Sequence, residues 1–352
     1  MSPSIRFPEF TGEWVLNEMW NIAPLQRGFD LPSGNVLDGT IPVVYSNGIL
    51  RYHNDYKCKA PAVITGRSGT IGKFTYLDKG YYWPHNTTLW VTDFCHNNPK
   101  FIYYLYQTIN ISQFATGSGV PTLNRNDVHR HRCYLPKSID EQRKIAAFLS
   151  LIDERIAIQD RLIEDLKKLR CAVSNKLFQS VKGVAIPLSG ISNIVKGKQI
   201  NGDFLADVGE YYVMNGGTEP SGYYDNYNVE ANTISISEGG NSCGYVQFNR
   251  MPFWSGGHCY TIQDIVSDVE TLYLYHYLKS KEDSIMKLRI GTGLPNIQKK
   301  DLAEFKVIIP AIEQQRTISN ILSLLERKTE IEGRMLIAMR TEKQYLLHQM
   351  FI

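Results

Sequence analysis

The sequence predicts an α+β protein: two mixed α/β domains in tandem repeat, each followed by a long helix, with the two helices forming an antiparallel coiled coil. Three observations lead to this prediction. Apolar residues recur every three or four positions through residues 140–179, the same pattern returns from Ile318 to Met350, and short strand-like runs precede each helical stretch. The predicted boundaries are residues 1–136, 137–182, 183–310 and 311–352.

Each long helix is predicted from alternating steps of four and three residues, the spacing of a coiled-coil seam. The seam positions of the first helix are Ile145, Leu149, Ile152, Ile156, Gln159, Ile163, Leu166, Arg170, Val173 and Leu177. Those of the second are Ile318, Leu322, Leu325, Thr329, Glu332, Leu336, Met339, Lys343, Leu346 and Met350. Both seams therefore carry polar residues at two of the same places.

These polar residues predict how the helices are aligned. Two equivalent helices that pack side by side about a twofold axis must run antiparallel. A register that keeps apolar residues opposite each other sets Arg170 against Glu332 and Lys343 against Gln159. Polar pairs in a seam can fix register, so we interpret these four residues as a registration device. Long side chains that reach past the seam into water explain them equally well.

The segment before the first helix predicts a mixed α/β domain. Its expected strands are Ile41–Tyr45, Ala62–Thr65, Gly72–Tyr76, Thr88–Thr92 and Val128–Leu135, with a helix over Pro99–Ile111. Near the end of each domain, Gly117-Ser-Gly-Val-Pro121 matches Gly291-Thr-Gly-Leu-Pro295. The central sequences of the two domains share little, which suggests one scaffold that presents two different recognition surfaces.

Composition narrows the class of protein. A chain of 352 residues suits two or three domains, and its formal charge of +3 gives no basic tail for nucleic acid. Six cysteines are scattered without metal-binding spacing, and neither a signal sequence nor an apolar run of membrane-spanning length occurs, so we expect a cytoplasmic protein with no membrane segment. Neither an adenine-methylation motif nor a phosphate-binding loop stands out. Asn98-Pro99-Lys100-Phe101 is instead interpreted as a helix start.

The order domain, helix, domain, helix, with G-S/T-G-x-P ending each domain and E-Q-R or Q-Q-R opening each helix, resembles the specificity (S) subunit of type I restriction-modification systems. The resemblance covers essentially the whole chain. It implies two target-recognition domains, each reading one half of a bipartite, asymmetric sequence in double-stranded DNA. The helices would measure the spacer, spanning about 50 Å, and dock two copies of the methyltransferase (modification) subunit.

The same resemblance implies a non-catalytic chain without a cofactor or metal of its own. AdoMet, ATP and Mg would then belong to partner subunits, one supplying DNA adenine methylation and a restriction/translocase subunit supplying ATP-dependent cleavage. A coiled-coil interaction scaffold that does not read DNA, and a fragment of a fused restriction-methylation enzyme, remain as alternatives.

DNA contacts are expected from polar side chains in Gly-bearing turns, where they can approach a groove. The candidates are Asn47, Arg67, Ser68, Thr70, Lys73, Asn124 and Arg125 in the first domain, and Lys196, Lys198, Asn215, Asn241, Ser242, Gln298, Lys299 and Lys300 in the second. For Asn124 and Arg125, and for residues 298–300, a polar loop that caps the next element is an equal alternative. Glu238 lies in one of the same turns.

Other polar and aromatic residues are interpreted as structural. His129, His131 and Cys133 have the alternate spacing of a metal site on a strand, but their counterparts in the second half are apolar. The tyrosines of residues 103–106 and 273–277 have helical spacing and are expected in the core. Gly66, Gly69, Gly239 and Gly240 are expected as turn formers.

Overall fold

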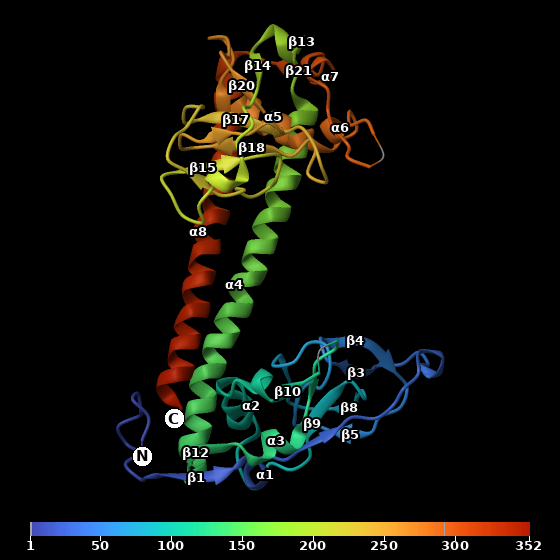
Figure 1. Cartoon of the computed structure of the whole chain (residues 1–352), viewed down its shortest axis with the longest axis vertical. Coiled ribbons are helices and arrows are strands. Elements are labelled where there is room, and N and C mark those ends of the chain that lie inside the picture. The colour runs from blue at the N-terminus through green and yellow to red at the C-terminus, as the bar shows by residue number, and fades with distance from the viewer. Residues whose placement is uncertain (1, 118, 292) are drawn as a thin grey trace. The chain divides into compact units, whose positions relative to one another are not determined.

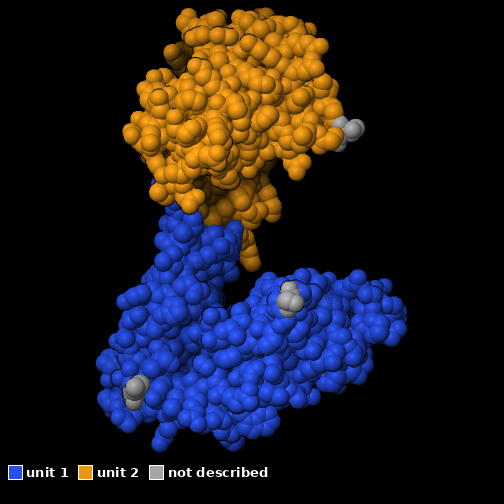
Figure 2. Space-filling view, viewed as in Figure 1, with its two compact units in different colours: residues 1–160, 334–352 blue, residues 161–333 orange. Residues whose placement is uncertain are grey.

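The computed structural model describes residues 2–117, 119–291 and 293–352. The chain divides into two compact units, unit 1 with residues 1–160 and 334–352 and unit 2 with residues 161–333 (Figure 2). Each unit holds a globular domain and part of each long helix, α4 (Ile139–Ser180) and α8 (Ile312–Met350) (Figure 1). The predicted α+β class with two long helices is confirmed. The second residues of the two glycine motifs, Ser118 and Thr292, lie outside the described residues.

The globular part of unit 1 is built on two four-stranded sheets, of strand order β2-β9-β6-β7 and β4-β3-β8-β5. Its strands are β1 (Trp14–Glu18), β2 (Leu25–Arg27), β3 (Ile41–Tyr45), β4 (Gly48–His53), β5 (Cys58–Lys59), β6 (Ala62–Gly66), β7 (Phe74–Leu77), β8 (Tyr81–Pro84), β9 (Thr88–Val91), β10 (Ala115–Thr116), β11 (Thr122–Leu123) and β12 (Arg132–Pro136). Its helices are α1 (Met19–Ile22), α2 (Pro99–Thr108) and α3 (Arg125–Arg130). Strands β1 and β12 pair antiparallel, and β12 leads into α4.

Unit 2 repeats this topology. Its strands are β13 (Val184–Pro187), β14 (Asn193–Lys196), β15 (Tyr211–Met214), β16 (Tyr223–Tyr224), β17 (Thr233–Ser237), β18 (Val246–Asn249), β19 (Trp254–Ser255), β20 (Cys259–Gln263) and β21 (Lys306–Ile309), and its helices are α5 (Thr271–Ser280), α6 (Glu282–Met286) and α7 (Lys299–Ala303). The order β14-β20-β17-β18 corresponds to β2-β9-β6-β7, and β16-β15-β19 corresponds to β4-β3-β8, parallel pair included. The duplication therefore extends through both globular domains.

Most expected elements of the first domain occur, with one correction. Asn98 caps α2 by accepting a hydrogen bond from the Phe101 N–H at 2.9 Å, which confirms the helix start. The strand expected over Val128–Leu135 is wrong in its first part. Asn124 accepts from the Asn126 N–H at 3.1 Å and starts α3, so only residues 132–136 form β12. A local capping bond thus overrides the alternating pattern.

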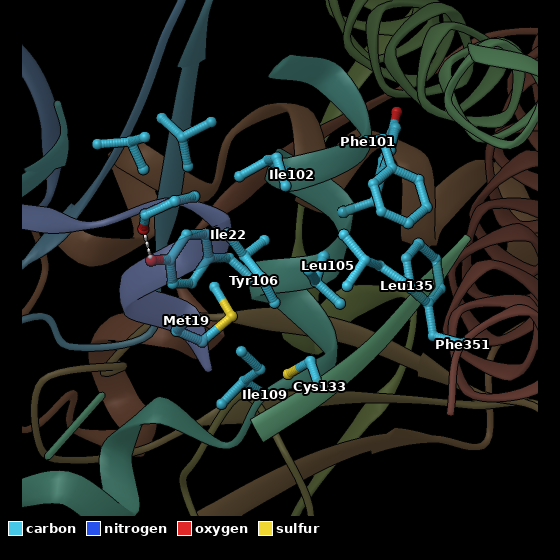
Figure 3. Close-up of a cluster of buried hydrophobic side chains, with 14 of the residues drawn as sticks. Met19, Ile22, Phe101, Ile102, Leu105, Tyr106, Ile109, Cys133, Leu135 and Phe351 are labelled. Carbon is cyan, nitrogen blue, oxygen red and sulfur yellow. Dashed lines mark hydrogen bonds between the residues drawn. The ribbon is translucent and has the colours of Figure 1, made fainter. Parts of the chain in front are cut away.

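The core of unit 1 joins the globular domain to the long helices (Figure 3). Phe351, which follows α8, stacks on Phe101 of α2 with ring centroids 5.2 Å apart, and Trp14 meets both rings edge-on. Tyr104 and Tyr106 are fully buried, so the expectation that these tyrosines are core residues is confirmed. Fully burying such rings stabilises the fold by about 1.5–3 kcal/mol each.

The core of unit 2 follows the same plan. Phe178 of α4 packs edge-on against Tyr273 and Tyr277 of α5, at 5.9 and 5.4 Å between centroids. Ile318 and Leu322 of α8 belong to the same apolar cluster. The second group of tyrosines is therefore also structural.

The predicted helix seams are confirmed by burial. All ten predicted positions of α4 and all ten of α8 are buried or half-buried. Four leucine and isoleucine residues of α4 that lie off the seam are exposed: Leu151, Ile158, Leu162 and Leu169. In unit 1 the helices run antiparallel, because Lys343 ion-pairs with Asp153 while Arg340 ion-pairs with Asp160.

The ion pairs across the coiled coil join other partners than the predicted ones. Arg170 Nη1 lies 3.1 Å from Glu326 Oε1, rather than pairing with Glu332. Lys343 Nζ lies 2.6 Å from Asp153 Oδ1, whereas Gln159 was the expected partner. These two ion pairs are repeats of each other, because Asp153 is equivalent to Glu326 in the duplicated sequence and Arg170 is equivalent to Lys343.

A tyrosine from each globular domain completes this contact. The Tyr104 hydroxyl donates to Asp153 Oδ2 at 2.7 Å, and the Tyr275 hydroxyl donates to Glu326 Oε1 at 2.8 Å. Burial raises the pKa of both tyrosines, and the adjacent carboxylate raises it further. Each hydroxyl therefore stays protonated and holds a carboxylate of the coiled coil in place.

The E-Q-R and Q-Q-R motifs have a structural role through their glutamines. Gln142 Oε1 accepts from the Asn98 N–H at 2.8 Å while its Nε2 donates to the Pro136 carbonyl. Gln315 Oε1 accepts from the Glu270 N–H at 2.9 Å while its Nε2 donates to the Pro310 carbonyl. Each glutamine therefore ties the start of a long helix to the N-cap of α2 or α5.

His276 makes unit 2 sensitive to acid. Its Nε2 lies 2.8 Å from Ser323 Oγ, and burial, aided by Arg170 and Arg250, lowers the pKa of His276 to about 4. Because the unfolded pKa is about 6.5, the stabilisation is present above pH 6.5 and is lost as the pH falls toward 4. We expect the replacement His276→Gln to reduce this acid-induced loss of unfolding free energy by about 2 kcal/mol. Urea unfolding at pH 7 and pH 4.5 measures it, with the exposed His348→Gln as control; equal losses in both variants would contradict it.

Candidate nucleic-acid interface

A cavity of about 440 Å³ opens beside the end of β6 in unit 1. Three predicted residues lie together in its lining, Arg67, Asn124 and Arg125. Arg27, at the end of β2, lies with them. Three guanidinium groups around one cavity suit an anionic ligand, and each can also bond the edge of a guanine.

The other predicted residues of unit 1 lie outside this lining as far as the structure describes it. Lys73 Nζ donates to the Asn47 carbonyl at 2.9 Å, across two exposed turns. The backbone of Ser68 forms a bridge with Thr122, which does line the cavity. Thr70 is exposed in the loop that follows β6.

Unit 2 has a cavity of about 610 Å³ at the corresponding place. The predicted residues Lys196, Asn215 and Ser242 lie together in its lining, with Glu238 and His258. The cavity is also lined by Gly216, Gly217, Gly239 and Gly240. Because glycines carry no side chain, a ligand can approach the backbone closely there.

Charged groups meet inside the second cavity. Lys196 Nζ lies 2.6 Å from Glu238 Oε1, and the Tyr260 hydroxyl lies 3.2 Å from the same oxygen. Burial, with a further contribution from Glu238, raises the pKa of Tyr260 to about 12. Tyr260 therefore remains a hydrogen-bond donor at neutral pH, and the carboxylate is held at the base of the cavity.

The remaining predicted residues of unit 2 flank the cavity rather than line it, within the part of the chain that the structure describes. Lys198 and Asn241 are exposed. Gln298 is the N-cap residue of α7, and Lys299 and Lys300 are its exposed first residues. In unit 1, by contrast, Asn124 both caps α3 and lines the first cavity, so it combines the two alternatives given for it.

Arg27 is a candidate residue that sequence reasoning missed. On β2 it pairs with Leu89, and Lys196 on β14 pairs with Tyr260 at the matching place of the second sheet. Arg27 and Lys196 are therefore equivalent. Aligning the two strands in the sequence would have identified Arg27 from the predicted Lys196. However, β2 has only three residues and shows no strand pattern in the sequence.

His129, one of the three residues considered as metal ligands, has a structural role in unit 1. His129 lies on α3 rather than on a strand, and its Nε2 accepts from the Leu25 N–H at 2.9 Å. Burial lowers the pKa of His129, so the ring is neutral and can accept. Over the described residues no group of metal-binding side chains occurs.

The expectation of turn glycines holds at two of the four positions, because Gly66 ends strand β6 and neither Gly66 nor Gly239 has a positive φ. Gly69 and Gly240 have φ of 80° and 76°, which favours glycine. Gly66 is required for space, because a Cβ there would lie 1.9 Å from the Thr70 carbonyl oxygen.

In the described part of the chain, no helix is both long and apolar enough to cross a membrane.

Comparison with known proteins gives a consistent result. A family model described as the type I restriction modification DNA specificity domain matches residues 19–168 and 184–338. A Mycoplasma genitalium protein named as a type I specificity subunit is 24% identical over 364 residues, covering 95% of this chain and 94% of that protein. A Mycoplasma pneumoniae protein of the same description is 31% identical over 166 residues, or 47% of this chain and 44% of the relative. The crystal structure of a type I restriction-modification S subunit from M. genitalium superposes with a TM-score of 0.73 at 22% identity, covering 100% of this chain and 99% of that one.

Proposed function

This chain belongs to the family of type I restriction-modification DNA specificity subunits, which are non-catalytic, and we propose that it reads a bipartite, asymmetric target in double-stranded DNA and positions two methyltransferase subunits there. One observation carries the proposal. Each unit has a cavity at the same place in the same topology, but the two cavities present different side chains. Two readers with one scaffold and different contacts suit a target with two unlike halves.

The chemistry of the cavities supports DNA as the ligand. The first contains Arg27, Arg67 and Arg125, which can bond phosphate or guanine. The second combines Lys196 and Asn215 with the carboxylate of Glu238. A mixture of donors and acceptors is what reading of base edges requires, whereas phosphate binding alone would require only donors. With a formal charge of +3, partner subunits would supply most of the phosphate neutralisation.

Two copies of the partner are proposed because the exposed apolar residues of the helices are also repeated. Leu151 and Ile158 of α4 are 60% and 65% exposed, and their counterparts in the repeat, Leu324 and Ile331 of α8, are 68% and 41% exposed. These residues lie off the seam on each helix. One methyltransferase subunit would cover each pair, and a restriction/translocase subunit would join that complex. AdoMet, ATP and Mg would be bound by these partners.

The test is to coexpress the chain with the methyltransferase subunit from the neighbouring reading frame in a methylation-free host. Mapping modified adenines across the genome should show a split motif with a constant gap. Exchange of residues 1–136 for those of another specificity subunit should change one half of the motif only, because the second domain keeps its contacts.

Two outcomes would contradict this proposal. A stable complex without modification would indicate an interaction scaffold that does not read DNA. Turnover of AdoMet by the purified chain alone would indicate a piece of a fused restriction-methylation enzyme. A methyltransferase subunit expressed without the chain is the control, and it should leave no split motif.

A further inference from the structure

We propose that Arg67 and Glu238 are the same base-reading position in the two domains, Arg67 selecting guanine in one half-site and Glu238 selecting a base with an exocyclic amino group in the other. That amino group lies on the major-groove edge, so the base is cytosine or adenine. The proposal rests on the proposed function and assigns a base class to one position of each half-site.

Strand pairing shows that the two residues are equivalent. Each follows directly the last residue of the third strand in its sheet, β6 or β17. The Arg67 N–H donates to the Thr87 carbonyl at 2.7 Å, and the Glu238 N–H donates to the His258 carbonyl at 2.9 Å. Thr87 and His258 are in turn the residues just before β9 and β20. The hydrogen bonds donated by the two backbone N–H groups therefore match.

The hydrogen bonds accepted by the two backbone carbonyls match as well. The Arg67 carbonyl accepts from the Leu123 N–H at 2.7 Å, and the Glu238 carbonyl accepts from the Ile297 N–H at 2.8 Å. Leu123 and Ile297 are equivalent in the duplicated sequence, because each is the second residue after the proline of its glycine motif. The backbone is thus fixed in the same way on both sides of position 67 and of position 238, and only the side chain differs.

Glu238 lines the second cavity, and one of its carboxylate oxygens accepts no hydrogen bond within the described residues. The residue is 7% exposed, and its Oε1 is bonded to Lys196. Its Oε2 is buried and has no hydrogen-bond donor among the described residues. His258 Nδ1 lies 3.7 Å from this oxygen, beyond hydrogen-bond distance, on a side chain that is 63% exposed. A buried carboxylate oxygen without a donor loses free energy, so a ligand that brings a donor is favoured.

The sign of the charge identifies the ligand group. A carboxylate repels a phosphate, so position 238 does not serve the DNA backbone. In the major groove the donors on base edges are the amino groups of cytosine (N4) and adenine (N6), and glutamate accepts from such groups. The cavity glycines would let these edges approach. Position 238 therefore reads bases.

The equivalence extends this result to Arg67. If both domains meet DNA in the same orientation, position 67 also faces base edges. Arg67 lines the cationic first cavity, and within the described residues its guanidinium has no ion-pair partner. Arginine bonds guanine O6 and N7 through two N–H groups, the commonest specific contact of this kind. The first half-site should therefore contain a guanine at this position.

The test uses the same coexpression system with Glu238→Gln and Arg67→Gln. We expect Glu238→Gln to lower discrimination at one base of the second half-site by about tenfold or more and to leave the first half-site and gap unchanged. We expect Arg67→Gln to do the same at one guanine of the first half-site only. Matched controls are the exposed residues Glu230→Gln and Arg132→Gln, which should keep the full motif.

A second measurement tests the proposal if a variant loses all methylation. It compares how tightly the wild-type complex binds duplexes that carry modified bases at the assigned positions. The wild-type complex should bind about tenfold less tightly when the amino group at the assigned base is removed, with purine replacing adenine or a 2-pyrimidinone replacing cytosine. Which replacement weakens binding identifies the base. In the first half-site, 7-deazaguanine should have a similar effect through the missing N7.

The outcomes separate the two proposals. An unchanged motif in both variants, or loss of discrimination in the half-site of the other domain, would overturn this inference while leaving the proposed function intact. Full binding of the wild-type complex to every altered duplex would do the same. Absence of any split motif with the wild-type chain would overturn the proposed function and this inference with it.

Discussion

Replacing Gln315 with leucine should lower the free energy of unfolding by about 3 kcal/mol. The side chain is fully buried, and it accepts from the Glu270 N–H and donates to the carbonyls of Asp268 and Pro310 at 3.0 and 2.9 Å. Leucine fills a similar volume but leaves one N–H and two carbonyls without partners. Each buried group left unsatisfied costs about 1–3 kcal/mol. Urea unfolding of the full chain, followed by circular dichroism, measures the change.

The matched control is the preceding residue. Gln314→Leu makes the same replacement at an exposed position and should change stability by less than about 0.5 kcal/mol. Gln142→Leu, the equivalent change in unit 1, should resemble Gln315→Leu, because Gln142 is 2% exposed and makes two of the same three bonds, the third going to the Asn97 side chain. Equal stabilities for the two variants at 314 and 315 would show that this tie is not a source of stability.

The sequence could predict the seam because burial follows from periodicity alone. Positions such as Leu149 and Leu322 recur at the spacing of one helix face, and a face made of apolar residues has to be covered. The repeat also predicted two domains. It could not predict the sheets in detail, since strands of two or three residues such as β2 and β5 carry no pattern of their own.

The register could not be predicted because the information lies outside the coiled coil. A seam that repeats every seven residues keeps apolar residues opposite each other when one helix slides by about two turns. Contacts with the globular domains help to select the observed alignment, since Tyr104 and Tyr275 of those domains bind Asp153 and Glu326 of the helices. No pattern within the two helices reports that contact.

The sequence predicted only part of the candidate site, because the rest again depends on contacts that no local pattern reports. The sequence placed Arg67 in a turn and Lys196 ahead of the turns of the second domain, and it identified both as candidates. It could not align Arg67 with Glu238, because the surrounding residues differ. Backbone hydrogen bonds, which the sequence does not report, establish that alignment.

The ion pair of Arg170 with Glu326 should show a large coupling in a double-mutant cycle. The two side chains are 32% and 15% exposed and lie 3.1 Å apart. Glu326→Gln should lower the free energy of unfolding by about 2 kcal/mol, because Arg170 loses its partner while partly buried. The same replacement in a chain that already carries Arg170→Gln should cost about 1 kcal/mol less, since the interaction is then absent.

The same cycle separates the two registers. If Arg170 faced Glu332, as the seam pattern predicts, the coupling would appear between those residues and be small with Glu326. The observed register requires the opposite, and it requires a second coupled pair, Asp153 with Lys343, at the equivalent place of unit 1. Because both pairs contact a tyrosine of their globular domain, replacing Tyr275 with phenylalanine should reduce the Arg170–Glu326 coupling. A coupling that is unchanged in that background would mean that the helices set their own alignment without the domains.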